Sequence, residues 1–61
     1  MKWVYYVRDD GLLLRANAVT TEFFGLQGWT KFSRDISEPD EQSRLEKISA
    51  KRAKNLLSKF A

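Results

Sequence analysis

A chain of 61 residues with no cysteine and no histidine has to fold around an apolar core alone. Disulfide bonds, which stabilise many small secreted domains, cannot form without cysteine. Zinc sites built from cysteine and histidine are excluded for the same reason. A chain of this length buries only about 60% of the surface that it exposes when unfolded. Because its hydrophobic fraction is 43%, which argues against disorder, we expect one small domain over residues 1–61 with a thin core.

An N-terminal β-hairpin is predicted around Asp10-Gly11. Aspartate followed by glycine is the favoured pair for a two-residue type I′ turn, in which both central residues need positive φ. This turn would pair Tyr5 with Ala16 and leave one face of the hairpin almost wholly apolar. A three-residue loop would instead pair Tyr5 with Arg15 and mix polar and apolar residues on each face. Because a slip of one residue exchanges the two faces, the clean separation favours the two-residue turn.

A second, shorter hairpin is predicted in residues 22–32, where aromatic side chains are dense. A turn on Gln27-Gly28 would place Phe23 opposite Phe32. A bulge at the preceding glycine is the alternative, since glycine is common where a strand bends.

Residues 33–44 are predicted to be a polar connection, in which a short helical turn from Ser37 is an alternative to loop. Residues 45–60 are predicted to form an amphipathic helix, which begins near Ser43 or is capped at Ser49. Its apolar residues recur at mostly three- and four-residue spacing: Leu45, Ile48, Ala53, Leu56, Leu57 and Phe60.

These elements predict an α+β fold, because an apolar sheet face has to be covered and the helix is the only amphipathic partner in the sequence. The expected architecture is a small antiparallel sheet of three to four strands, a β-meander in residues 1–32, packed against one C-terminal amphipathic helix.

The residue types exclude most catalytic, phosphate-binding and metal-binding motifs. Catalytic triads need cysteine or histidine, and three scattered glycines cannot make a phosphate-binding loop. Glu38, Asp40 and Glu41 lack the spacing of a calcium loop and are interpreted as carboxylates near a helix start. The N-terminal apolar run is too short for a signal peptide or a membrane span. We therefore expect a cytoplasmic, non-enzymatic protein with no cofactor, no metal and no membrane contact.

Charge is distributed unevenly along the chain. Residues 37–46 are acidic, whereas residues 47–61 carry five basic residues and no acidic one. This basic segment is interpreted as a solvated helix face or as a surface that lies along a phosphate backbone. The candidate nucleic-acid contacts are Lys47, Lys51, Arg52, Lys54 and Lys59.

The outer face of the first hairpin is a candidate interaction surface, made by Tyr6, Arg8, Leu13 and Arg15. In the favoured register Tyr6 and Arg15 are cross-strand neighbours. Such a pair shields a sheet face by a cation–π contact, stacks on nucleobases, or anchors a protein interface.

Two resemblances follow from these motifs. The strand of residues 3–8, the Asp-Gly turn, Gly28-Trp29 and the helical pattern of residues 48–57 are similar to small uncharacterised bacterial and phage-encoded proteins of unknown function. The sheet-then-helix order also resembles the arm-binding N-terminal domains of tyrosine recombinases, which insert their sheet into the DNA major groove. That second resemblance implies DNA contacts by Tyr6, Arg8 and Arg15, although the acidic residues 37–46 depart from the pattern.

The function predicted from the sequence is a small non-enzymatic binding module of unknown specific function, related to phages or mobile elements. It would act by protein–protein contact or self-association through the outer sheet face. The alternative is a nucleic-acid-binding module that uses the basic helix and the aromatic and arginine side chains of the sheet.

Overall fold

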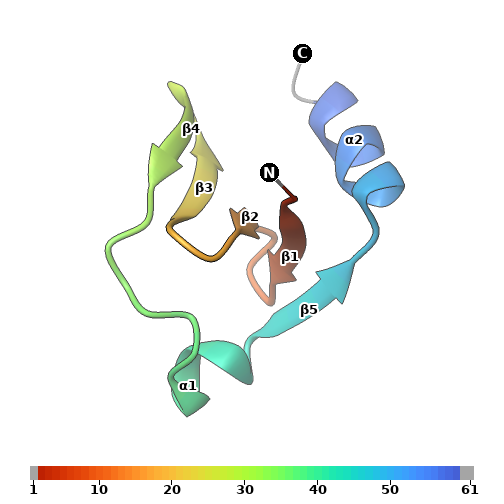
Figure 1. Ribbon diagram of the computed structural model, residues 1–61. Coiled ribbons are helices and arrows are strands. Elements are labelled where there is room, and N and C mark those ends of the chain that lie inside the picture. The colour runs from red at the N-terminus through yellow and green to blue at the C-terminus, as the bar shows by residue number, and fades with distance from the viewer. Residues whose placement is uncertain (1, 60–61) are drawn as a thin grey trace.

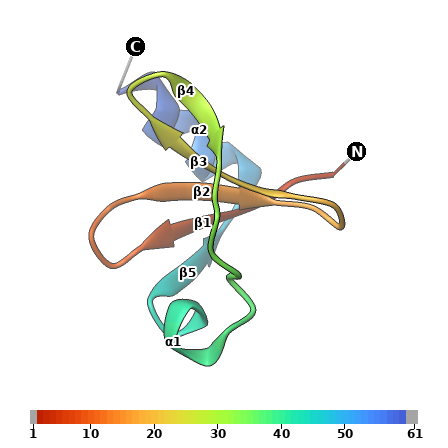
Figure 2. The same cartoon turned by 90° about the vertical axis from the view of Figure 1, so that its left-hand side faces the viewer.

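The computed structural model describes residues 2–59, which form a five-stranded antiparallel sheet and two helices (Figure 1). In chain order the elements are β1 (Val4–Arg8), β2 (Leu13–Ala16), β3 (Thr21–Gly25), β4 (Gly28–Lys31), α1 (Pro39–Gln42), β5 (Leu45–Ile48) and α2 (Ala50–Ser58). The first four strands form a meander, and β5 pairs with the other edge of β1, so that the order is β4-β3-β2-β1-β5. Figure 2 shows the strong twist of this sheet from β4 to β5. The α+β fold is confirmed, with five strands rather than three to four.

The fifth strand corrects the predicted helix of residues 45–60. Leu45 and Ile48 are three residues apart, so a helix would place them on one face, but in β5 they point to opposite sides of the sheet. Both sides are covered in this fold, and both positions are therefore apolar. The helix begins only after Ser49, whose hydroxyl accepts the backbone N–H of Arg52 at 3.1 Å. The cap at Ser49 was the correct alternative, while Phe60 lies outside the described residues.

One side of the sheet is covered by α2. Ala53 of the helix is buried against Leu13 and Ile48 of the sheet. The half-buried apolar side chains packed around this cluster are Tyr5, Val7, Phe24, Trp29, Leu56 and Leu57. We call this side the α2 face.

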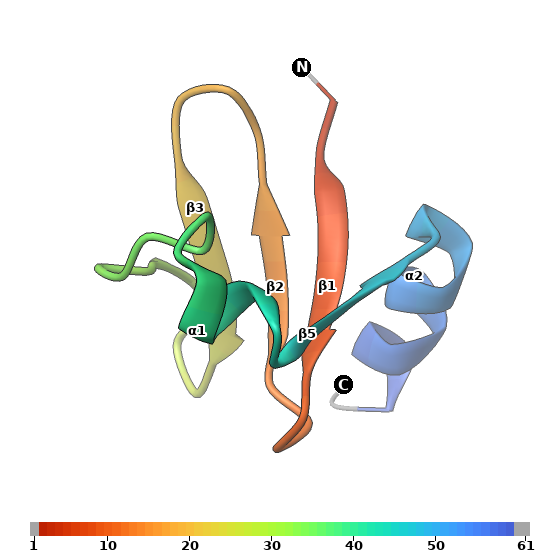
Figure 3. The same ribbon diagram turned by 90° about the horizontal axis from the view of Figure 1, so that it is seen from below.

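The other side of the sheet is covered by the segment that the sequence predicted as a polar connection. Figure 3 shows α1 in front of β3 and the chain from α1 to β5 in front of β2. Leu14, the largest fully buried side chain in residues 2–59, has no exposed surface and lies on this side, which we call the α1 face. The helix begins at Pro39 rather than Ser37, because Ser37 is held by the carboxylate of Asp35 through its backbone N–H and its hydroxyl. Residues 33–44 are thus a covering layer as well as a connection.

The first hairpin has the three-residue loop and not the two-residue turn. Gly11 has a φ of 91°, and no residue other than glycine in residues 2–59 has a positive φ. Asp10 therefore cannot be a central residue of a type I′ turn, and Gly11 takes the left-handed position of a three-residue loop. Tyr5 lies opposite Arg15, which was the register set aside in the sequence.

The second hairpin is shifted by two residues from the predicted one. Its turn is Leu26-Gln27, and the residue with positive φ is Gly28, at 89°. Phe23 consequently lies opposite Thr30. A shift of two residues keeps each side chain on its predicted face. For that reason the rings of Phe23 and Phe32 still meet, with centroids 5.9 Å apart, as diagonal neighbours.

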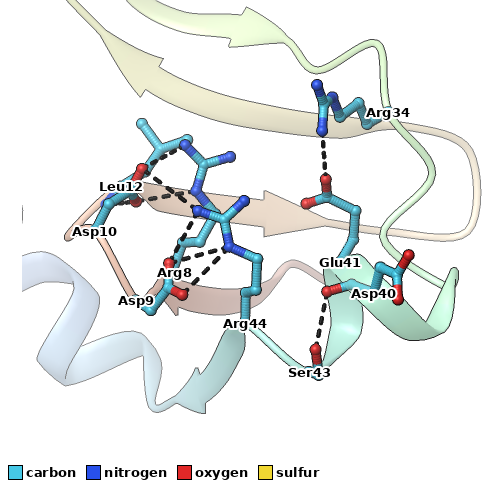
Figure 4. A network of polar contacts seen from close by, with 9 residues as sticks. All are labelled: Arg8, Asp9, Asp10, Leu12, Arg34, Asp40, Glu41, Ser43 and Arg44. Carbon is cyan, nitrogen blue, oxygen red and sulfur yellow. Dashed lines mark hydrogen bonds and ion pairs between the residues drawn. The ribbon is translucent and has the colours of Figure 1, made fainter.

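Polar contacts tie the first hairpin loop to the start of β5 (Figure 4). The guanidinium of Arg8 donates two hydrogen bonds to the carboxylate of Asp10, at 2.9 and 2.6 Å. Asp10 also accepts the backbone N–H of Leu12. Arg44 reaches the same loop through Asp9, where its Nη2 lies 3.0 Å from a carboxylate oxygen. These bonds are made within and across the three-residue loop and stabilise it.

This network predicts how stability depends on pH. The hydrogen bonds from Arg8 and then from the Leu12 N–H hold the pKa of Asp10 well below its usual range. A carboxyl whose pKa is lower in the folded state contributes stability that is complete above its unfolded pKa of about 3.9 and is lost as the pH falls. We expect wild-type stability to decline below about pH 4, and the Asp10→Asn variant to lose less over the same interval. Urea unfolding followed by circular dichroism from pH 7 to pH 2 measures this difference.

Glu38→Gln is the control for that measurement, because the Glu38 carboxylate makes no ion pair within residues 2–59. Its pH curve should be parallel to that of the wild type. Identical acid sensitivity in the wild type and in Asp10→Asn would show that the Arg8–Asp10 contact does not contribute to folding.

Candidate functional site

The four residues of the predicted interaction surface do not lie together. Tyr6 pairs with Leu14, and both belong to the α1 face. Leu13 and Arg15 belong to the α2 face, where Leu13 is only 3% exposed. Arg8 is engaged with Asp10. The single exposed sheet face expected from the sequence, including the one implied by the recombinase resemblance, is therefore not formed.

Arg15 instead lies between two tryptophans. Its guanidinium carbon is 4.1 Å from the ring centroid of Trp3 and 4.1 Å from that of Trp29. Glu22, directly opposite on β3, accepts the Nε–H of Arg15 at 2.8 Å. The predicted stacking of Arg15 with Tyr6 is wrong, because the observed register puts those side chains on opposite faces. We call Trp3, Trp29, Arg15 and Glu22 the tryptophan clamp.

The clamp explains why a mixed face is tolerated. The register that places Arg15 on the α2 face also places Glu22 beside it, so that the charge is neutralised where it is partly buried. The indole rings cover the planar guanidinium by cation–π contacts. This arrangement could have been found from the sequence in the register of the three-residue loop. In that register Tyr5, Arg15 and Glu22 form one row across three strands, so that the arginine has a carboxylate beside it.

Arginine and lysine side chains differ in whether they form ion pairs. Every arginine of residues 2–59 is in an ion pair with at least one carboxylate, whereas no lysine in that range is in an ion pair. The arginine pairs are Arg8–Asp10, Arg15–Glu22, Arg34–Glu41, Arg44–Asp9 and Arg52–Glu46. The positive charge left over is therefore carried by lysine.

Two of those lysines, Lys51 and Lys54, lie on α2, and a third, Lys59, is its C-cap residue. Lys51, Lys54 and Lys59 are all exposed, while Ala53 and the two leucines of the helix turn toward the sheet. We call these three residues the lysine face. Lys47, predicted with them, is in β5 opposite Tyr6 and so belongs to the α1 face.

Arg52, the fifth predicted contact, is 3.7 Å from Glu46 and 61% exposed at its side chain, so its charge is partly offset.

The unpaired acids gather on the other side of the molecule. Asp35, Glu38 and Asp40 line a hollow of about 490 Å³ beside α1, together with Ser33, Arg34 and Glu41. Figure 1 shows α1 and α2 on opposite sides of the sheet. Asp40 and Glu41 occupy the first turn of α1, as the sequence indicated, and residues 2–59 contain no group of side chains suited to hold a metal ion. The molecule thus has an acidic pole and a basic pole.

Buried Glu41 belongs to this acidic pole. Its Oε1 accepts a hydrogen bond from Arg34 at 2.8 Å, whereas its Oε2 is enclosed without a hydrogen-bond partner in the described part of the chain (Figure 4). Arg34 is 68% exposed at its side chain. The pair therefore anchors α1 at the rim of the covering layer.

Two exposed apolar side chains form no common surface. Val19 and Leu26 are the large apolar residues that protrude most, but they lie before and after β3, in turns at its opposite ends. Single exposed apolar residues are normal on protein surfaces. No helix of the described chain is both long enough and apolar enough to cross a membrane.

Fold and surface together define a small α+β domain with a lysine face on its C-terminal helix. The chain matches no known protein family, no curated protein and no solved structure. The assignment of a function therefore depends on the geometry of this surface.

Proposed function

We propose that this chain is a small, non-enzymatic, cytoplasmic module that binds nucleic acid through the lysine face of α2. The observation that carries the proposal is the selective pairing of charges. The fold pairs its arginines with carboxylates and leaves Lys51 and Lys54 of α2 and its C-cap Lys59 exposed, with no ion pair in residues 2–59. Lysines that displace counterions from phosphates supply affinity that does not depend on sequence.

The spacing of the lysine face suits a phosphate backbone. Lys51 and Lys59 are eight residues apart, which corresponds to about 12 Å along a helix. Lysine side chains distributed over this length can contact more than one phosphate of a strand. The acidic pole, on the opposite side of the sheet, repels phosphates and orients the domain with α2 toward the ligand.

The outer sheet face gives no comparable support to protein–protein contact. That hypothesis relied on Leu13 and Arg15 being exposed beside Tyr6. Leu13 is buried and Arg15 is held in the tryptophan clamp. The nucleic-acid function, which was the alternative from the sequence, is therefore the one that the geometry favours.

Two double variants with the same change in net charge test the role of the lysine face. Lys51→Gln/Lys54→Gln removes two charges from α2, and Lys2→Gln/Lys47→Gln removes two charges from elsewhere. We expect the first variant to bind a mixed-sequence DNA more weakly and to reduce the slope of log K against log salt by about 2. The second variant should keep most of the wild-type slope. Fluorescence anisotropy of labelled DNA at several salt concentrations measures both.

Equal losses in the two variants would show that only net charge matters and would refute a site on α2. Absence of binding by the wild type at low salt would refute the proposed function itself. Binding that is independent of salt would do the same, because contacts to phosphates release counterions.

A further inference from the structure

We infer that Trp3 and Trp29 make this module selective for single-stranded nucleic acid, with unpaired bases stacking on the indoles while the lysine face holds the phosphates. The inference rests on the proposed function and adds the class of ligand. It starts from the tryptophan clamp, which was not among the predicted sites and which a binding surface made of lysine alone would not require.

The clamp holds its rings in fixed orientations. The guanidinium of Arg15 stacks on both indoles at 4.1 Å and is itself held by Glu22. Trp29 has further ring neighbours, Phe24 with centroids 5.4 Å apart and Tyr5 at 6.4 Å. Aromatic rings that are already ordered lose little conformational entropy when a base stacks on them.

The clamp lies on the same side of the sheet as α2. Trp29 packs against the cluster that contains Ala53 of the helix. Figure 1 shows α2 on the side of β5, with β3 and β4 at the far end of the twisted sheet. Trp3 and Trp29 are each half-buried, so neither residue is completely enclosed.

A basic residue flanks Trp29 on the side away from α2. Lys31 follows Trp29 by two residues in β4, so it projects from the same face, and it is exposed. It forms no ion pair within residues 2–59. The clamp thus has an exposed basic side chain beside its indoles, and proteins that bind single strands combine aromatic and basic side chains in this way.

Duplex nucleic acid does not offer its base faces to such a surface. In a double helix the bases are stacked on one another, and only their edges reach the grooves. An unpaired base exposes a flat aromatic face of any sequence, so stacking distinguishes single strands without reading their bases. The lysine face alone contacts phosphates of either form.

The intrinsic fluorescence of the protein reports on this site, because Trp3 and Trp29 are the two tryptophans of the chain. The probes are an oligothymidylate of about 12 nucleotides, an oligouridylate of the same length and a DNA duplex of the same length, within the site sizes of small single-strand-binding folds. We expect single strands to quench the tryptophan emission and to bind at least about tenfold more tightly than the duplex. The two single-stranded probes separate a preference for DNA from one for RNA.

Trp3→Leu removes one stacking surface and keeps apolar cover over Arg15. We expect it to weaken binding of oligothymidylate roughly tenfold and to leave duplex binding unchanged. Trp3→Phe is the matched control, since it keeps a smaller aromatic ring and should retain part of the preference. Circular dichroism verifies that both variants fold, and quenching of the wild type stands as an independent measurement if Trp3→Leu does not.

Equal affinity for single strands and duplex without quenching would overturn the inference and leave the proposed function standing. A preference for single strands that survives Trp3→Leu, with no quenching in the wild type, would also overturn it. Failure of the wild type to bind any of the three probes would overturn the proposed function and this inference together.

Discussion

Replacing Leu14 by alanine is expected to lower the free energy of unfolding by about 3 kcal/mol, the usual cost of a cavity at a fully buried leucine. Leu14 has no exposed surface and lies where residues 33–44 cover the sheet. A domain of this size has only about 3 to 9 kcal/mol of stability in total. The loss is therefore about a third or more of the total, and the urea midpoint measured by circular dichroism should fall by the same share.

Val19→Ala is the control for Leu14→Ala, because Val19 is 80% exposed and its truncation should change stability by less than about 0.5 kcal/mol. A Leu14→Ala variant as stable as Val19→Ala would contradict the packing of residues 33–44 on the α1 face. The comparison therefore tests whether residues 33–44, predicted as a polar connection, cover the α1 face.

Replacing Arg15 by alanine should cost about 2 kcal/mol, since it removes two cation–π contacts and leaves the carboxylate of Glu22 without its partner. The side chains of Arg15 and Glu22 are 22% and 24% exposed, so water solvates an orphaned Glu22 only in part. Arg15→Lys keeps the charge and loses the planar stack, and should cost less than Arg15→Ala. Urea unfolding gives the stabilities, and a red shift of the tryptophan emission would report that the indoles are uncovered.

A double-mutant cycle with Glu22→Gln tests whether the clamp acts as a unit. If it does, the double variant should be destabilised by less than the sum of the two single variants. Additive losses, with an unchanged emission spectrum in Arg15→Ala, would show that Arg15 contributes no more than a solvated surface arginine. The same variants would tell whether the clamp stabilises the sheet beyond the area that α2 covers.

The two covered faces account for the main difference between the expected and the observed candidate site. The sequence was interpreted as a sheet with one buried face, so Tyr6, Arg8, Leu13 and Arg15 were grouped as an exposed surface. Residues 33–44 cover the second face, and the three-residue loop moves Arg15 beneath the indoles. The basic residues of α2 were identified correctly as exposed, because nothing in residues 50–59 other than the apolar stripe faces the sheet.

Local patterns in the sequence were sufficient to place two hairpins, the glycine at the first loop and an amphipathic C-terminal helix, with the cap at Ser49 as one of two alternatives. These features depend on neighbours a few residues apart. Only the tertiary structure decided that residues 45–48 form a strand, since their partner is β1, about 40 residues earlier in the chain. It also decided the register of the first hairpin. For an isolated hairpin, the separation of polar and apolar faces predicts the register of the two-residue turn. Once β3 and β4 are in place, Glu22 and the two tryptophans stabilise the register of the three-residue loop.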